Sequence, residues 1–189
     1  MAVRVNGHLA KEALTNLIEA IRANPRLASG TTMVRVKWAG GTQAIGHVRQ
    51  FEPIVVDEPP ALGGSDRGPN PVELFLVALG ACQELMLAVL AEQLGLEIHA
   101  IDVEVQGELD LRGCLGIDPK VRPGFQRLEV SVHIVSPEPE ERLRELLALA
   151  ERLCPVSDML RNPVPVQMNL EVSHAGSSAM RLDNPSVAS

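Results

Sequence analysis

Aromatic side chains are scarce in this sequence, which has no tyrosine, one tryptophan and three phenylalanines, together 2% of the chain. Basic residues are also in the minority, because 17 Lys and Arg stand against 24 Asp and Glu and leave a formal net charge of −7. Proteins that bind nucleic acid usually offer basic patches to the phosphates and aromatic rings to the bases. The composition therefore argues against a nucleic-acid partner.

The sequence also lacks a basic N-terminal stretch that leads into an apolar core, the pattern of a signal peptide. Its most apolar stretch, residues 74–91, is interrupted by Gln83 and Glu84, so we expect no membrane span. There are only three cysteines. Without secretory features we expect a cytoplasmic protein, and in that compartment paired thiols are more often redox-active or metal-binding than structural.

The length and composition fit one folded unit. With 189 residues, 46% of them hydrophobic and 22% charged, the chain can bury a sizeable core in a single domain. We expect an N-terminal helical extension over residues 1–30, one folded domain over 31–173, and a disordered tail over 174–189.

The first part of the chain predicts a helix followed by a small antiparallel meander. Apolar residues recur at helical spacing over residues 8–23, and Pro25 follows as a stop. Turn-forming glycines and prolines then separate β-prone runs. The three strands are expected at residues 31–38, 43–50 and 53–57.

A long apolar helix is the central element of the prediction. Asn70 can cap its start, Pro71 suits the first position, and Glu73 can complete a capping box. Gly95 marks its end. Because nearly every face is apolar over residues 74–82, this helix should be surrounded by protein.

The second half predicts two half-buried antiparallel strands, an amphipathic helix and a final strand. Ser136 and Pro137 open the helix and Pro155 closes it. We place the two strands at residues 101–111 and 128–134, the loop between them at 113–124, and the last strand at 164–172.

Cys82 and Cys154 are the candidate reactive residues. Cys82 lies inside the central apolar helix, and Cys154 lies at the end of the amphipathic helix. A buried cysteine is often only a small hydrophobic residue, so core filling is the first alternative. If the two thiols meet, one can attack the O–O bond of a peroxide and the other can condense with the resulting sulfenic acid to give a disulfide. A thiol inside a helix gains little from the helix dipole, so this chemistry needs a nearby cation.

Two motifs resemble the OsmC/Ohr family of osmotically inducible and organic hydroperoxide resistance proteins. The first comprises GG, GPNPVEL and ALGAC within residues 63–82, and the second is AERLCPVS at residues 150–157. The order of strands and helices over residues 31–172 is also similar to that family. The resemblance implies an α+β fold, an intertwined homodimer in which antiparallel sheets wrap two central helices, and thiol-dependent reduction of organic hydroperoxides. Cys82 then matches the peroxidatic cysteine and Cys154 the resolving cysteine.

The sequence departs from the family pattern at the start of the central helix. The family's peroxidases carry N-P-E there, with the glutamate orienting an active-site arginine, whereas this chain has Val72 at that position and Glu73 one residue later. One residue rotates a side chain by about 100° around the helix. Glu73 is therefore a candidate either for the site or for the capping box alone.

The arginine that the family uses has no obvious counterpart. The strand before the loop ends in Asp57 and Glu58, which would raise the pKa of a nearby thiol. Arg49 is the preferred candidate, with Arg35 and Arg67 as alternatives, and each also suits a solvated surface.

No cofactor or metal site is expected. The five histidines show no metal-ligand spacing with one another or with the cysteines, and Cys114 has no family counterpart. Two functions stay open: a peroxidase for alkyl or lipid hydroperoxides, regenerated by a dithiol reductant such as a lipoylated protein, or a dimer of the same fold without peroxidase activity that binds a small apolar ligand.

Overall fold

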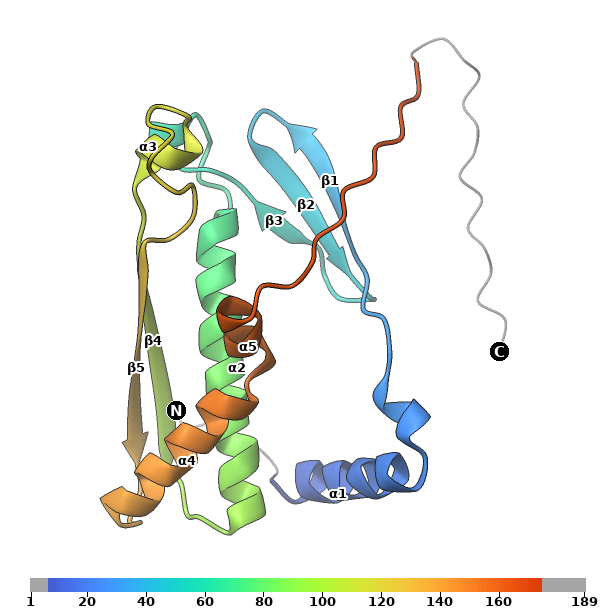
Figure 1. Ribbon diagram of the computed structural model, residues 1–189, viewed down its shortest axis with the longest axis vertical. Coiled ribbons are helices and arrows are strands. Elements are labelled where there is room, and N and C mark those ends of the chain that lie inside the picture. Colours follow the sequence, from blue (N-terminus) through green and yellow to red (C-terminus); the bar gives the residue numbers. More distant parts are fainter. Residues whose placement is uncertain (1–6, 175–189) are drawn as a thin grey trace.

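The computed structural model describes residues 7–174, with side chains from residue 12 on. The long central helix is α2, Pro71–Leu94, and the other elements of the main body pack around it (Figure 1). Asn70 caps it in a complete capping box with Glu73, and Gly95 ends it in the left-handed conformation, so the predicted boundaries are confirmed. By length and composition α2 could also cross a membrane, a property that it shares with core helices of soluble proteins.

A two-stranded antiparallel sheet covers one side of α2. Its strands are β4, Ala100–Glu108, and β5, Arg127–Val135, and their burial alternates along much of their length as the sequence pattern predicts. The sheet approaches α2 closely at Gly80, where an added Cβ would lie 3.1 Å from Val105 Cγ2. Glycine at this helix position therefore fits the distance between the two layers.

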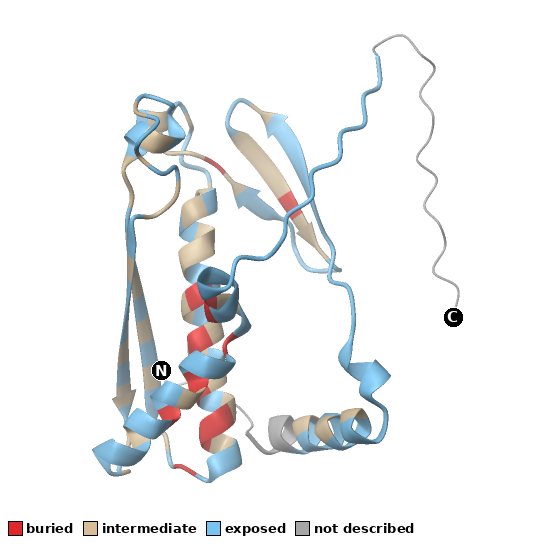
Figure 2. Cartoon of the chain, in the orientation of Figure 1, coloured by how far each residue is buried: buried red, intermediate tan, exposed pale blue. Residues whose placement is uncertain are grey.

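The amphipathic helix α4, Glu140–Leu153, packs on α2 and completes the core. Leu87 of α2 and Leu146 and Ala150 of α4 have no exposed surface. Full burial of one leucine side chain contributes about 1.5–3 kcal/mol. Figure 2 shows that most of the buried positions lie on or beside α2, with two more on β2 and after β3. The buried apolar cluster comes from α2, α4 and Leu96, so the core is small and lies where the two helices cross.

A second sheet stands apart from this body. It has the order β1-β2-β3, formed by Val34–Gly40, Gln43–Val48 and Ile54–Val56, and all its pairs are antiparallel. Figure 2 shows that its strands are mostly exposed or half-buried. The predicted meander is therefore present, but residues 7–174 leave its faces largely uncovered.

Asp57 organises the segment that links this sheet to α2. Its carboxylate is 2% exposed and accepts hydrogen bonds from the Thr42 hydroxyl and from the backbone N–H groups of Glu58, Ser65 and Arg67. Burial alone would raise the pKa of Asp57, but these four hydrogen bonds outweigh it and lower the pKa. The carboxylate thus holds the loop that the sequence predicted as irregular.

The N-terminal helix α1 spans Gly7–Ala23 and contacts α2. Three short helical turns lie between the longer elements, namely η1 Pro25–Ala28, η2 Pro60–Leu62 and α3 Leu111–Cys114. The last of these corrects the prediction, because Leu111 lies in a short helix capped by Asp110 rather than in the preceding strand. The disordered tail was predicted from residue 174, and all of it after that residue lies outside the described range.

The start of α4 also differs from the prediction. The helix begins at Glu140, although Ser136 and Pro137 were expected to open it. The Ser136 hydroxyl instead donates to the Glu97 carbonyl and accepts from the Glu138 N–H. Two prolines, at positions 137 and 139, disfavour helical geometry in the residues before them, so the helix starts only after both.

The strand predicted at residues 164–172 is absent, and this segment is extended without a hydrogen-bonded neighbour strand. Its even-numbered apolar side chains are strongly exposed: Val166 is 83% exposed, Met168 88% and Leu170 87%. A strand exists only when its backbone groups pair with another strand. The alternating sequence pattern is present, but the partner strand is not provided by this chain in the described residues.

The exposed area of the chain is large for its mass. The surface measures 15628 Å², whereas a compact monomer of 20.4 kDa exposes about 8800 Å². The residues outside the described range add at most about 3200 Å² when they are counted as extended chain. Most of the excess therefore belongs to the described residues, including the apolar face of β1 and the segment 164–172.

Candidate functional site

The fold brings the two candidate cysteines together. The Sγ atoms of Cys82, on α2, and Cys154, after α4, lie 2.8 Å apart, although 72 positions separate the residues in sequence. Both are free thiols. A disulfide needs a sulfur separation of about 2.0 Å, so a small movement of either side chain brings the pair to bonding distance.

Cys154 occupies the junction of two helices. It caps the C-terminus of α4, with its N–H bonded to the Ala150 carbonyl, and it is also the N-cap of a further helix, α5, Pro155–Arg161. The sequence predicted that Pro155 closes α4, but the same proline also takes the first position of α5. The Cys154 sulfur accepts the N–H of Ser157 at 3.5 Å, as the side-chain oxygen of an ordinary N-cap would.

Gln83 connects this junction to the central helix. Its Nε2 donates to the Ser157 hydroxyl oxygen at 2.6 Å, and both residues are buried, at 4% and 6% exposure. Gln83 Oε1 is buried without a hydrogen-bond partner in the described part of the chain. A buried amide in an otherwise apolar helix costs free energy unless it is bonded, so the Gln83–Ser157 contact fixes the position of α5 against α2.

The pKa values of the two thiols are shifted in opposite directions. Burial, together with the hydrogen bond to Cys154, raises the pKa of the Cys82 thiol. Burial also opposes the charge on Cys154, but hydrogen bonds from Cys82, from the Ser157 N–H and hydroxyl, and from the Val156 N–H outweigh it and lower the pKa of Cys154. The first proton lost from the pair therefore leaves a negative charge on Cys154, with Cys82 as its hydrogen-bond donor.

The two sulfurs also differ in their exposure to solvent. Cys154 has no exposed surface, whereas Cys82 is partly exposed. The more acidic thiol is thus the one that a molecule in solution cannot touch directly.

Glu73 takes the role of a helix-capping residue. One of its carboxylate oxygens accepts the Asn70 N–H at 2.8 Å, while the Asn70 side chain accepts the Glu73 N–H at 2.9 Å. The matching family position, Val72, lines an apolar cavity with Phe75 and Phe125, whose rings stack at 5.9 Å. The structure gives Glu73 no contact with either cysteine among the described residues.

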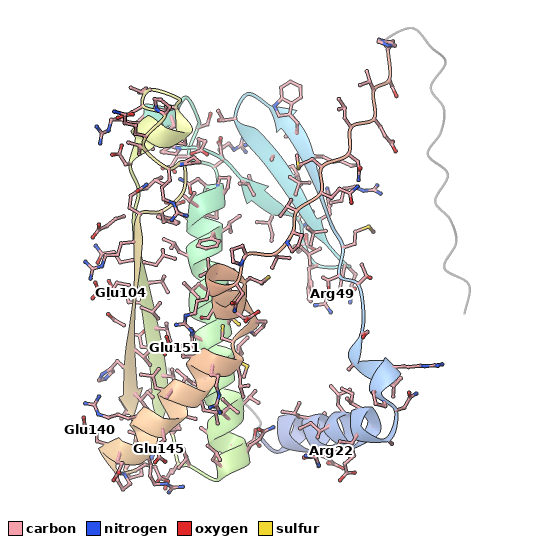
Figure 3. The ribbon with its side chains drawn as sticks, in the orientation of Figure 1. Arg22, Arg49, Glu104, Glu140, Glu145 and Glu151 are labelled. Carbon is pink, nitrogen blue, oxygen red and sulfur yellow. The ribbon has the colours of Figure 1, made fainter. Side chains whose placement is uncertain are left out.

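The arginine candidates also lie elsewhere. The Arg49 guanidinium stacks over the Phe51 ring at 4.5 Å, and Figure 3 shows its side chain beside the separate sheet rather than on α2. Arg35 lies opposite His47 in the register of β1 and β2, and Arg67 donates its backbone N–H to the Asp57 carboxylate. No guanidinium contacts Cys82 or Cys154 within residues 12–174.

No three His, Cys, Asp or Glu side chains gather in a metal-binding group within the described residues. Cys114 is exposed, and its sulfur donates to the Leu111 carbonyl in α3.

Two residues of the site, Gln83 and Ser157, were not singled out from the sequence. The available signals were a lone amide inside an apolar helix, and a serine three residues after a cysteine that precedes proline, the spacing of an N-cap and its bonding partner. Gln83 also lines a cavity of about 430 Å³ between α2, β5 and α5 whose other walls include Leu79, Val130 and Leu160.

Comparison with known proteins gives one matching family and several similar structures. Residues 63–169 match the model of the OsmC-like proteins. The uncharacterized protein YmaD of Bacillus subtilis is 25% identical over 146 residues, which cover 76% of this chain and 95% of that relative.

Solved structures with the same fold include an OsmC-like protein from Mycoplasma pneumoniae, with a TM-score of 0.62 and 18% identity over 71% of this chain and 90% of that one. An organic hydroperoxide resistance protein OsmC from Legionella pneumophila has a TM-score of 0.56 and 21% identity over 70% of this chain and 90% of that one. Both likenesses concern the α+β fold. Because the family match spans more than half of the sequence and includes both cysteine motifs, this chain belongs to the OsmC-like family.

Proposed function

We propose that this protein is a thiol-dependent peroxidase that reduces organic hydroperoxides in oxidative stress defence, with Cys82 as the attacking residue and Cys154 as the resolving residue. The observation that carries the proposal is the 2.8 Å separation of the two sulfurs, one partly exposed and one buried. Some solved structures of this fold bear the name of organic hydroperoxide resistance proteins.

The reaction begins from the singly ionised pair. Cys82 gives its proton to the Cys154 thiolate as its own sulfur attacks the outer oxygen of the hydroperoxide. The O–O bond breaks, the alcohol leaves after taking up a proton, and Cys82 becomes a sulfenic acid. The Cys154 thiol then condenses with that sulfenic acid, forming the disulfide and releasing water. An external dithiol, such as a lipoyl group on a protein, returns two electrons and two protons to restore the pair.

Within one chain the Cys154 thiolate serves as the base for Cys82, since the described residues place no guanidinium at the pair. Arg49 meets Cys82 only if a second copy of the chain supplies it. Glu73 would contribute only indirectly, because its carboxylate fixes the N-terminus of α2.

The surroundings favour an apolar substrate. The cavity beside Gln83 and Ser157 has leucine and valine side chains on most of its walls. Binding of an alkyl or lipid tail there would remove apolar surface from water at about 25 cal/mol per Å². Hydrogen peroxide would gain nothing from these walls, so the proposal includes a preference for organic hydroperoxides.

The active form is a homodimer in the cytoplasm. The apolar positions on β1, with Val36 63% and Trp38 79% exposed, and on the segment 164–172 are not covered by the residues that the structure describes. A second copy provides the same surfaces in a complementary arrangement. Light scattering tests this directly, with an expected mass of about 41 kDa, twice the 20.4 kDa of one chain.

The decisive experiment is turnover of cumene hydroperoxide with a dithiol reductant. Cys82→Ser should lower the rate by more than about a hundredfold, because the attacking sulfur is removed. Cys154→Ser should react more slowly, because the Cys154 thiolate serves as the base for Cys82, and without the dithiol it should consume no more than about one equivalent of hydroperoxide. Cys114→Ser is the matched control and should keep full activity, because its thiol lies in α3. Undiminished turnover by Cys82→Ser would contradict the proposal.

A second function is supported by the same apolar cavity. If the pair does not turn over, the protein is a dimer of this fold that holds a small apolar ligand beside Gln83. Titration with a fluorescent fatty acid separates the two, since stoichiometric binding without hydroperoxide consumption would select the binding function.

A further inference from the structure

The Cys82–Cys154 pair is asymmetric in access and in bonding. Cys154 Sγ is buried under the first turn of α5, where it accepts the Ser157 N–H, while Cys82 is the partly exposed member. Once the two sulfurs form a disulfide, an incoming thiol from solution can therefore reach only one of them.

The contact between Gln83 and Ser157 determines where the serine proton lies. Gln83 Nε2 donates to the Ser157 oxygen at 2.6 Å, so that oxygen acts as an acceptor and its own proton is free for another group. The neighbouring acceptor is Cys154 Sγ, which Ser157 already bonds through its N–H at 3.5 Å. The opposite amide orientation would make Ser157 donate to Gln83 and would remove that proton from the sulfur.

We infer that Gln83 and Ser157 are positioning residues that make Cys154 the leaving sulfur when the disulfide is reduced, so that the reductant attacks Cys82. The first thiolate of a dithiol reductant attacks Cys82 Sγ, the Cys82–Cys154 bond breaks, and its electron pair goes to Cys154. A mixed disulfide between the reductant and Cys82 results. The second thiol of the same reductant then attacks the reductant sulfur that is bonded to Cys82, the reductant leaves as a cyclic disulfide, and Cys82 takes up a proton and is again a thiol.

The leaving sulfur in a thiol–disulfide exchange departs faster when its thiolate is more stable. Hydrogen bonds from Ser157 and Val156 stabilise the Cys154 thiolate and lower its pKa against the effect of burial. Cys82 has the opposite shift, since burial raises its pKa. Access and leaving-group stability thus select the same direction of attack.

The inference deepens the proposed function by naming how its disulfide is regenerated, but its test uses no hydroperoxide. Cys114→Ser protein is oxidised to the Cys82–Cys154 disulfide with diamide, mixed briefly with glutathione, quenched with acid and digested with trypsin. Cleavage after Arg67, Arg112, Arg152 and Arg161 places the two cysteines on separate peptides. We expect glutathione on the Cys82 peptide in at least tenfold excess. Equal labelling, or labelling mainly on Cys154, would overturn the inference.

Substitutions test the positioning role. Ser157→Ala and Gln83→Leu should each slow reduction of the disulfide by dithiothreitol about threefold for every unit by which the pKa of Cys154 rises. Ser131→Ala, an exposed serine on β5, and Gln93→Leu, an exposed residue of α2, are the matched controls and should change nothing. The pKa is read from thiolate absorbance in Cys82→Ser, Cys114→Ser protein with and without Ser157→Ala.

The outcomes are distinguishable from failure of the peroxidase proposal. A protein that ignores hydroperoxides still forms and loses its disulfide, so labelling of Cys82 and slowed reduction would uphold the inference by themselves. If Ser157→Ala is reduced as fast as Ser131→Ala, the positioning role is wrong. If either variant fails to fold, the glutathione map of the unsubstituted pair still decides the direction of attack.

Discussion

Cys154 and Ser157 stand in the relationship of a helix N-cap and its third residue, with sulfur in place of oxygen. The Ser157 N–H points to Cys154 Sγ at 3.5 Å, and the same cysteine closes the preceding helix. The Cys154 thiol therefore belongs to the junction between α4 and α5. Its chemistry and the placement of α5 depend on the same few atoms.

Thiol titration should show two separated steps. In Cys114→Ser protein, absorbance at 240 nm should reveal one ionisation below the ordinary pKa of a thiol and one above it, because the first charge on Cys154 raises the pKa of Cys82 further. Ser157→Ala should bring the two steps closer together. Two overlapping ionisations in the unsubstituted pair would show that the pair is not coupled.

Oxidation of the pair should stabilise the fold. The disulfide would close a loop that spans the 72 positions between the cysteines, for which the loss of unfolded-state entropy contributes about 4 kcal/mol. Urea unfolding of the diamide-treated and reduced Cys114→Ser protein measures the difference. Cys154→Ser protein, treated in the same way, should show none, and a lower midpoint for the oxidised protein would mean that closing the bond strains the native site.

Asp57 should make the fold sensitive to acid. The folded pKa of Asp57 is lowered, so its contribution to stability is present above the ordinary pKa of an aspartate and is lost as the pH falls through the folded value. Asp57→Asn should lower the melting temperature by several degrees at pH 7, and by less at pH 3, which lies below the ordinary pKa of an aspartate, so that part of the contribution is already lost. Asp102→Asn, on β4, is the control without this hydrogen-bond set. An equal loss at both pH values would assign the effect to packing alone.

Gly80 should tolerate no large side chain. An added Cβ already lies 3.1 Å from Val105 Cγ2, so Gly80→Val forces β4 away from α2 and should cost about 1–3 kcal/mol in the free energy of unfolding. Gly124→Val, in a loop where an added Cβ meets nothing within 4 Å, is the matched change and should cost far less. Denaturant unfolding of the two variants gives the comparison.

The apolar positions of the C-terminal segment should control assembly. The double substitution Val166→Ser, Leu170→Ser removes two side chains that are more than 80% exposed in the single chain, so a monomer should not be harmed by it. In the proposed dimer it should shift the mass from two chains toward one. Gln167→Ser, Asn169→Ser alters the alternate positions of the same segment and should leave the mass unchanged. Size-exclusion chromatography with light scattering measures both.

Local signals in the sequence predicted most of the fold. The boundaries of α2 follow from Asn70, Pro71 and Gly95, each of which acts through its own backbone and needs no distant partner. The start of α4 was misplaced because Ser136 bonds to Glu97, a contact that only the folded chain creates. The last strand was predicted from alternation alone, but alternation states which face is apolar and not which strand will pair with it.

The site was predictable in its cysteines and not in their environment. The family motifs identified Cys82 and Cys154 as candidates, but sequence spacing gave no distance between them. The hydrogen bond from Gln83 to Ser157 joins residues 74 positions apart, so no local rule could reveal it. The contact of Glu73 is local instead, and the capping box was one of the two roles that the sequence predicted for this residue.

The uncovered three-stranded sheet has a consequence for how the chain reaches its final state. In the proposed dimer a second copy covers this sheet, so intramolecular collapse alone cannot complete the core, and the last folding step would be second-order in protein concentration. At low protein concentration the monomers would expose these apolar strands to water for longer. Chains translated from one messenger RNA would associate most readily near the ribosomes that produce them. The speed of folding, and the risk of aggregation during that wait, would be set by the abundance of the protein itself.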